Sequence, residues 1–498
     1  MFKRTLPALL FLGIANPAGA ATPSSPIEDD KPSEPQPHWN CFTASDARMR
    51  KQQVERNLLP RVAFVGETKP ADVETSMARH KTPAFSVAVI RNGTLDWSAA
   101  WGRLQTDGAR AGCDSLFQAG SLAKPATVLA ALRMQQQGIV DFDADIEATL
   151  SSWHLPAGRQ THAHPVTLRN LFTHTAGITP GGYEGYVQGQ PIPTDPQTVA
   201  GEAPSNSRKA EVLEAPGTSL NYSGGGYTVA EIALQDRLHE PFEQIMRSWL
   251  TVPIGMKQAD FTQPLPAASH GYTVRGHQAD GSVVPGGWHN HPEQAAAGLW
   301  ATASDLATLL IELRKGWQGR SEVFTQDSIR ELLANPIDGH GYGFRLIGEG
   351  DRVFLTHYGG TVGYRAGMTM NLETGDGAVY LTNSDNGSDL GLEFLAAVSG
   401  VYDWPVFRPT RVERATLPVE ALKSLVGRYQ FADGPTISVV YEQDALTLLF
   451  PNGNRYTMTP IVGAPREFIH PDTAVRASFE GEGEDTTIQL YGETGRRL

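Results

Sequence analysis

The residues with the clearest chemical potential are Ser121 and Lys124, which stand three positions apart in the run 118–134. Apolar residues recur at helical spacing through this run, so the pattern predicts a helix with both side chains on one face. A serine hydroxyl becomes a nucleophile when a neighbouring base removes its proton, and a buried lysine with a lowered pKa can be that base. First-turn N–H groups could also stabilise a developing oxyanion. The plain alternative is an ordinary helix start followed by a solvated lysine.

Two glycine-rich stretches hold the next candidates. Tyr222 stands in a tight turn before a predicted helix over 227–238, and a phenol beside a lysine ammonium can have a lowered pKa and act as a general base. The alternative is a tyrosine that only packs. The run 357–361, His-Tyr-Gly-Gly-Thr, ends a predicted strand with two glycines, where backbone can approach a ligand closely and an N–H can face an oxyanion.

The elements that must position these residues follow the order sheet, helical region, sheet. We expect a hairpin around Asn92-Gly93, a helical region over 139–300 with a Gly/Pro-rich rim loop at 177–206, and a helix over 303–313. Four later strands are predicted at 342–346, 353–357, 364–371 and 378–383. This order predicts an α+β domain over 46–408, with one sheet closed by both terminal portions and packed against helices.

The last part of the chain differs in character. Residues 409–417 are polar and contain proline, which indicates a linker. Five short strand signals follow, at 427–431, 436–441, 445–450, 456–461 and 475–479. We therefore predict a separate small all-β domain over 418–498.

Composition limits the classes of function. The chain has 498 residues, a net charge of −13 and no basic run, so nucleic acid is not an expected partner. Residues 1–20 have a basic start, an apolar core and a small-residue cleavage site, which predicts a signal peptide and a periplasmic or extracellular product. Residues 21–45 read as a flexible leader rich in proline. No later run is long and apolar enough to predict a membrane span.

Cysteines and histidines give weaker signals. Cys41 and Cys113 could form one disulfide in an oxidising compartment or remain two separate thiols. The two His-x-His runs, at 162–164 and 289–291, lack further ligands at metal spacing, so we predict surface histidines and no metal site. His174 is interpreted as a structural residue at a helix end rather than as a base.

Taken in order, Ser121-Leu122-Ala123-Lys124, Tyr222-Ser223-Gly224 and His357-Tyr358-Gly359 resemble the three motifs of the serine β-lactamase and penicillin-binding-protein superfamily. They look most similar to its branch of class C β-lactamases, D-alanyl-D-alanine carboxypeptidases and esterases. Three further stretches also resemble this branch, at 167–177, 253–256 and 297–306.

The resemblance implies a five-stranded antiparallel sheet with flanking helices, no cofactor, and a site between the sheet and the helical region. It implies that Ser121 is the acylated nucleophile, that Lys124 and Tyr222 share its proton, and that N–H groups of Ser121 and Gly360 form the oxyanion hole. The implied substrate-binding residues are His357, Tyr358, Gly359 and Gly224.

Two departures from the branch's pattern shape the expected activity. Gly224 stands where Tyr-x-Asn members have an asparagine that bonds a substrate amide, and His357 replaces a lysine and has no permanent charge at neutral pH. The sequence thus predicts a secreted serine hydrolase for an ester, a D-amino-acid peptide or amide, or a β-lactam as a weak substrate. The alternative is a penicillin- or peptidoglycan-binding protein with negligible turnover. Under either interpretation the expected partner is a small molecule or a cell-wall peptide. The sequence does not indicate an oligomeric state.

Overall fold

A computed structural model describes residues 41–105, 108–334, 337, 339–432, 434–463 and 466–498. The predicted signal peptide at 1–20, and the leader up to residue 40, lie outside these residues. Within them the chain forms an α+β domain followed by an all-β barrel, so the predicted fold class is confirmed. Cys41 and Cys113, which the sequence left open, form a disulfide with Cα atoms 5.3 Å apart.

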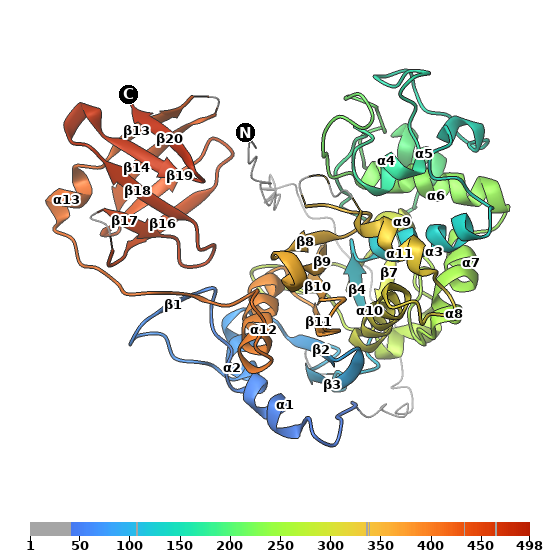
Figure 1. Cartoon of the computed structure of the whole chain (residues 1–498), viewed down its shortest axis with the longest axis horizontal. Helices are drawn as coiled ribbons and strands as arrows, with labels where there is room; N and C mark the ends of the chain where they lie inside the picture. The colour runs from blue at the N-terminus through green and yellow to red at the C-terminus, as the bar shows by residue number, and fades with distance from the viewer. Residues whose placement is uncertain (1–40, 106–107, 335–336, 338, 433, 464–465) are drawn as a thin grey trace, which may run out of the picture.

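An antiparallel sheet forms the centre of the first domain (Figure 1). Its strands run in the order β3 (Thr94–Gly102), β2 (Ala84–Arg91), β11 (Gly377–Thr382), β10 (Tyr364–Met370), β9 (Phe354–Thr361) and β8 (Arg345–Ile347). The sheet has six strands, not the five that the resemblance implied, because the short β8 adds an edge beside β9. The pairing of β2 with β11, inside the sheet, joins the two terminal portions of the domain, as predicted.

Helices cover both faces of this sheet. In β2, Phe85, Val87 and Val89 pack into a core with α1 (Arg48–Glu55) and α12 (Gly387–Val401). The alternate positions Ala88 and Ile90 belong to the core on the other face, where α10 (Ala303–Trp317) lies. Successive strand residues point to opposite faces, so a strand covered on both sides is apolar throughout.

A helical region continues the second core beside the sheet (Figure 1). It contains α3 (Ala123–Gln136), α4 (Leu168–Phe172), α5 (Asp195–Ala200), α6 (Gly224–Leu238), α7 (Phe242–Met246), α8 (Val252–Ile254), α9 (Gln294–Ala297) and α11 (Gln326–Leu333). The short strands β4 (Phe117–Gly120) and β7 (Leu299–Ala301) pair with each other, as do β5 (Tyr186–Val187) and β6 (His289–Asn290). The sequence predicted a turn before a helix at 227, whereas α6 begins three residues earlier, because Gly224 to Gly226 form its first turn.

The C-terminal strands close into a barrel at one end of the molecule, drawn in red in Figure 1. After α13 (Val419–Lys423) they are β13 (Gly427–Phe431), β14 (Thr436–Glu442), β15 (Ala445–Leu449), β16 (Arg455–Pro460), β17 (Glu467–Ile469), β18 (Arg476–Glu480), β19 (Thr487–Leu490) and β20 (Glu493–Arg497). The predicted linker contains β12 (Thr410–Val412), which pairs in parallel with β1 (Val62–Phe64). The helix α2 (Val73–Arg79) follows β1. No helix within the described ranges is long and apolar enough to cross a membrane.

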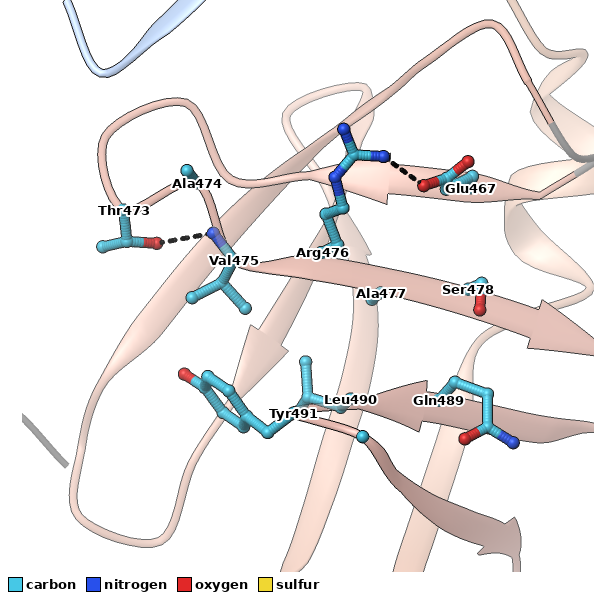
Figure 2. Close-up of a pocket in the computed structure, with 11 residues that line it drawn as sticks. Glu467, Thr473, Ala474, Val475, Arg476, Ala477, Ser478, Gln489, Leu490 and Tyr491 are labelled. Carbon is cyan, nitrogen blue, oxygen red and sulfur yellow. Dashed lines mark hydrogen bonds and ion pairs between the residues drawn. The ribbon is translucent and has the colours of Figure 1, made fainter. Parts of the chain in front are cut away.

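A surface pocket of about 470 Å³ lies on the barrel, lined only by residues between 467 and 492. Figure 2 shows Tyr491 at one side of it and the ion pair of Arg476 with Glu467 at the other. None of the three motifs lines this pocket, so it is separate from the candidate active site.

Candidate active site

The candidate nucleophile Ser121 lies between the end of β4 and the start of α3. Gly120 ends the strand with φ at +53°, a conformation that L side chains rarely adopt, and this turn carries the chain directly into the helix. The Nζ atom of Lys124 lies 3.2 Å from the Oγ atom of Ser121. The predicted approach of the two side chains is therefore present.

Lys124 is buried, with 2% of its surface exposed. Its amine also donates a hydrogen bond to the carbonyl oxygen of Ala296 at 2.7 Å, and it lies over the rings of Tyr222 and Tyr227 at 5.0 and 5.5 Å. Burial disfavours the ammonium form and lowers the pKa of Lys124 from 10.5 to about 7. A large share of this lysine is thus a neutral amine near pH 7, which is what a base beside a serine requires.

Tyr222 stands just before Ser223, the residue that caps α6. Its ring packs on the imidazole of His174 with centroids 4.2 Å apart. Enclosure of its hydroxyl raises the pKa of Tyr222, although a hydrogen bond with Ser121 opposes the rise and the residue as a whole is 44% exposed. The sequence-based expectation of a lowered pKa is therefore wrong: the cost of burying a phenolate exceeds the help from the Ser121 hydrogen bond, and the phenol stays protonated at neutral pH.

His174 orients this second motif. It follows α4 with φ at +59°, and its Nδ1 atom accepts a hydrogen bond from the Ser223 N–H at 3.1 Å. Burial, with the charge of Lys124 as the next cause, holds the pKa of His174 well below 6.5, so the ring is neutral. Its interpretation as a structural residue agrees with these contacts, but its packing against the Tyr222 ring was not predicted.

His357 completes the cluster from β9. It is buried, and its Nε2 atom lies 3.5 Å from the hydroxyl of Tyr222. Burial, followed by the nearby charge of Lys124, lowers the pKa of His357 to about 3, so the ring carries no charge at neutral pH. The side chain of Tyr358 packs in the opposite core, on the α12 side, and leaves only its backbone for the site.

Glycines let the end of β4 and strand β9 approach closely. A Cβ atom on Gly359 would lie 2.0 Å from the carbonyl oxygen of Ala119 and 3.2 Å from the nitrogen of Ser121. A Cβ atom on Gly120 would lie 2.8 Å from the nitrogen of Gly360. The two predicted oxyanion-hole residues therefore come together only because no side chain separates these backbones.

The family comparison agrees with this geometry. The sequence profile of the family described as Beta-lactamase matches residues 71–399, a span that holds all three motifs. The chain belongs to the Beta-lactamase family. It is a serine hydrolase of the group that contains penicillin-binding proteins, class C β-lactamases and D-alanyl-D-alanine carboxypeptidases, as the resemblance implied.

Individual members of the Beta-lactamase family are distant from this chain. Penicillin-binding protein 4* of Bacillus subtilis (strain 168) is 20% identical over 407 residues, which cover 76% of this chain and 86% of that protein. The D-alanyl-D-alanine-carboxypeptidase/endopeptidase AmpH of Escherichia coli (strain K12) is 27% identical over 155 residues, 30% of this chain and 37% of AmpH.

A solved structure covers both domains. The octameric penicillin-binding protein homologue from Pyrococcus abyssi matches with a TM-score of 0.59 at 19% identity, over 85% of this chain and 98% of that one. D-alanine carboxypeptidase AmpC from Burkholderia cenocepacia matches with a TM-score of 0.55 at 18% identity, over 71% and 99%. Both support the fold of this family member.

The histidines of the two His-x-His runs were predicted to lie at the surface. His162 and His164 are exposed as predicted, but His291 is fully buried, so its prediction as a surface histidine is wrong. His291 directly follows β6 and lies close enough to Lys124 for their charges to interact, and a two-residue strand shows no alternation from which its burial could be predicted. Among the described residues, no group of three or more His, Cys, Asp or Glu side chains could hold a metal ion.

Proposed function

We propose that the protein is an exported hydrolase that works through an acyl-enzyme on Ser121. The observation that carries this proposal is the buried Lys124 amine 3.2 Å from the Ser121 hydroxyl, with a pKa of about 7. A neutral amine at this place can take the serine proton as the oxygen attacks a carbonyl carbon.

The remaining steps follow from the same groups. As the Ser121 oxygen bonds to the carbonyl carbon, the negative charge on the carbonyl oxygen is met by the N–H groups of Ser121 and Gly360. The proton held by Lys124 passes through the Tyr222 hydroxyl to the leaving oxygen or nitrogen, and the carbonyl carbon loses that group. Water then attacks the acyl-enzyme, gives its proton to the same groups, and restores the serine hydroxyl.

The surroundings favour substrates with little charge. His357 is neutral and offers no fixed cation for a carboxylate, and Gly224 offers no amide for a substrate peptide group. In place of that amide, the ring of Tyr183 lies 3.1 Å from where a Gly224 Cβ atom would stand. We therefore place esters and D-amino-acid peptides or amides ahead of β-lactams, which are expected to be poor substrates.

The second candidate is a penicillin- or peptidoglycan-binding protein with negligible turnover. The same two departures, at Gly224 and His357, favour it, because they remove groups that bind a substrate without removing the nucleophile. It differs from the hydrolase in one measurable way: its acyl-enzyme persists.

Intact-mass spectrometry after incubation with a penicillin, and separately with a p-nitrophenyl ester, tests the proposal. The wild type is expected to gain one acyl mass that decays as product accumulates, and the matched variant Ser121→Ala is expected to gain none. An adduct that does not decay favours the binding protein, and an equal adduct on Ser121→Ala refutes the assignment. Export is tested separately by fractionation and by the mass of the mature protein, which we expect to begin at Ala21.

A further inference from the structure

The one-turn helix α9 holds the acceptor that Lys124 uses. The Lys124 amine lies 2.7 Å from the Ala296 carbonyl oxygen, closer than the 3.2 Å to Ser121. This carbonyl lies in the last turn of a helix, where carbonyl groups have no partner within the helix and can accept from elsewhere. The position of α9 therefore sets where the lysine amine can lie.

The other end of α9 is held by Glu231. One carboxyl oxygen of Glu231 accepts from the Ala295 N–H at 2.8 Å, and the other lies 3.3 Å from the Gln294 nitrogen, whose N–H also donates to the Pro292 carbonyl oxygen at 2.8 Å. Glu231 is 1% exposed and lies in α6, the helix that begins two residues after Tyr222. A carboxyl at a helix N-terminus satisfies N–H groups that have no partner within the helix and interacts favourably with the helix dipole.

We propose that Glu231 is a positioning residue that holds α9, and through the Ala296 carbonyl orients the Lys124 amine toward Ser121. This role rests on the proposed function, in which Lys124 is the base. A neutral amine has two N–H bonds and one lone pair, so a hydrogen bond donated to Ala296 turns the lone pair toward the serine hydroxyl. Glu231 thus links α6, the helix that follows Tyr222, to Lys124, the proposed base for Ser121.

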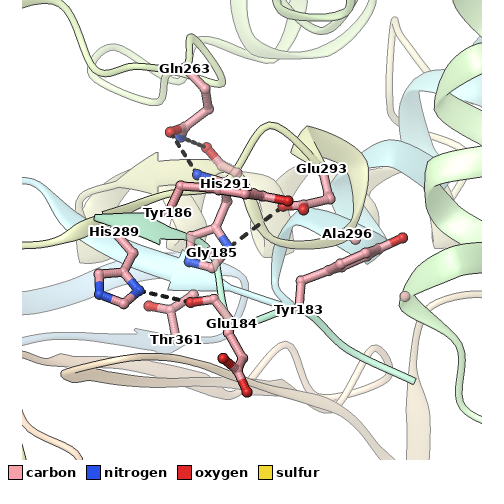
Figure 3. Close-up of polar contacts among 12 residues, drawn as sticks. Tyr183, Glu184, Gly185, Tyr186, Gln263, His289, His291, Glu293, Ala296 and Thr361 are labelled. Carbon is pink, nitrogen blue, oxygen red and sulfur yellow. Dashed lines mark hydrogen bonds and ion pairs between the residues drawn. The ribbon is translucent and has the colours of Figure 1, made fainter. Parts of the chain in front are cut away.

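Neighbouring buried groups do not supply this support. Figure 3 shows His291 and Glu293 near Ala296, with the His291 Nδ1 atom 3.8 Å from a carboxyl oxygen of Glu293. Neither carboxyl oxygen of Glu293 has a hydrogen-bond partner among the described residues. The other titratable side chains around Lys124 are Tyr222 and Tyr227, whose rings it contacts, and His174 and His357. Of the two buried glutamates beside α9, only Glu231 accepts side-chain hydrogen bonds from the α9 backbone in the described part of the chain.

The test uses two variants of Glu231 and a matched pair at Asp305. Asp305 is also a buried carboxyl that accepts backbone N–H groups, from Lys257 at 2.7 Å and from Gln258 and Thr302 at 3.3 Å each. It completes the capping box of α10 with Thr302, the N-cap residue, and has no hydrogen bond to Lys124 among the described residues. Burial raises the pKa of the Glu231 carboxyl, so Glu231→Gln is a close neutral substitute, whereas Glu231→Ala removes the acceptor. The controls are Asp305→Asn and Asp305→Ala.

The first readout is the titration of Lys124, followed by NMR in lysine-labelled full-length protein and assigned with Lys124→Met. The Ala296 carbonyl stabilises the ammonium form, so Glu231→Ala is expected to lower the pKa of Lys124 and Asp305→Ala is expected to leave it unchanged. A Lys124 pKa that is unchanged, or higher, in Glu231→Ala refutes the positioning role. This readout needs no substrate, so it stands even if the proposed function fails.

The second readout is the acylation rate constant with a p-nitrophenyl ester, measured separately from the substrate dissociation constant. Glu231→Ala is expected to lower the rate constant roughly 10- to 100-fold with an unchanged dissociation constant, because small misplacements of a base have effects of that size. Glu231→Gln is expected to recover most of the rate, and both Asp305 variants to acylate as the wild type does. If Glu231→Ala does not fold, Glu231→Met takes its place, because methionine fills a similar volume and offers no oxygen acceptor. A Lys124 pKa that is lower in Glu231→Met than in Glu231→Gln supports the role, and equal values in these two variants refute it.

Discussion

Replacing Lys124 with methionine is expected to abolish acylation and to change stability in a way that depends on pH. In the folded protein the pKa of Lys124 is about 7, against 10.5 for an ordinary lysine. Between these values the unfolded chain binds more protons than the folded chain, so this residue makes the free energy of unfolding rise with pH. The cost of keeping the lysine neutral in the folded state is about 4 kcal/mol at pH 7 and about 2 kcal/mol at pH 9.

Methionine removes this cost but also removes the donor to the Ala296 carbonyl. A buried carbonyl left without a partner costs about 1–3 kcal/mol, so Lys124→Met is expected to be more stable than the wild type at pH 7 by about 1–3 kcal/mol. The carbonyl cost is the same at both pH values. The stability difference between variant and wild type is therefore expected to shrink by about 2 kcal/mol from pH 7 to pH 9.

Urea unfolding followed by tryptophan fluorescence measures this difference. All 9 tryptophans precede residue 405, and all except Trp39 of the leader lie in the hydrolase domain, so the barrel contributes no signal. In parallel, the acylation rate of the wild type is expected to fall tenfold per pH unit below a midpoint near the Lys124 pKa of about 7. A stability difference that does not change with pH, together with a rate that does not fall below pH 7, would show that Lys124 stays charged and would refute the reasoning.

Three other predictions follow from single contacts. His174→Ala leaves the Ser223 N–H without its acceptor and is expected to lower stability by about 1–3 kcal/mol and to slow acylation, both measurable on one preparation; an unchanged acylation rate would contradict it. Gly359→Ala places a methyl group 2.0 Å from the Ala119 carbonyl oxygen and is expected to cut acylation by about 10²- to 10³-fold, whereas Gly400→Ala, which meets nothing within 4 Å, is expected to acylate normally. Replacing both Cys41 and Cys113 with alanine opens a connection across 72 residues and is expected to cost about 2–4 kcal/mol in urea unfolding; no loss would contradict the bridge's role.

The sequence carried the local signals of the site well. Asn92 and Gly93 predicted the first hairpin because both must adopt positive φ, and they do, at +53° and +77°. The spacing of Ser121 and Lys124 predicted their contact because the turn that leads into α3 brings residues three apart onto one side. These features depend on residues close together in the chain, where geometry follows from residue type.

Features that depend on distant residues were not predictable in the same way. The predicted direction of the Tyr222 pKa shift was wrong because burial, its largest cause, is decided by elements far apart in sequence. Burial of His291 was missed for the same reason. In the barrel, strands β17, β19 and β20 were missed because they are short and partly polar, and only closure of the sheet gives them partners.

The pairing of β2 with β11 has a consequence for how the domain folds. Residues 85–90 of β2 pair with β3 on one edge and with residues 377–382 of β11 on the other. Because β11 is synthesised late, this second edge of β2 is unpaired during most of synthesis. Contacts this far apart in sequence slow folding and leave strand edges open to association with other chains. A chain that ends before β11 already contains Ser121 and, in β9, Gly360. It lacks β11, the strand through which β9 and β10 are joined to β2 in one sheet.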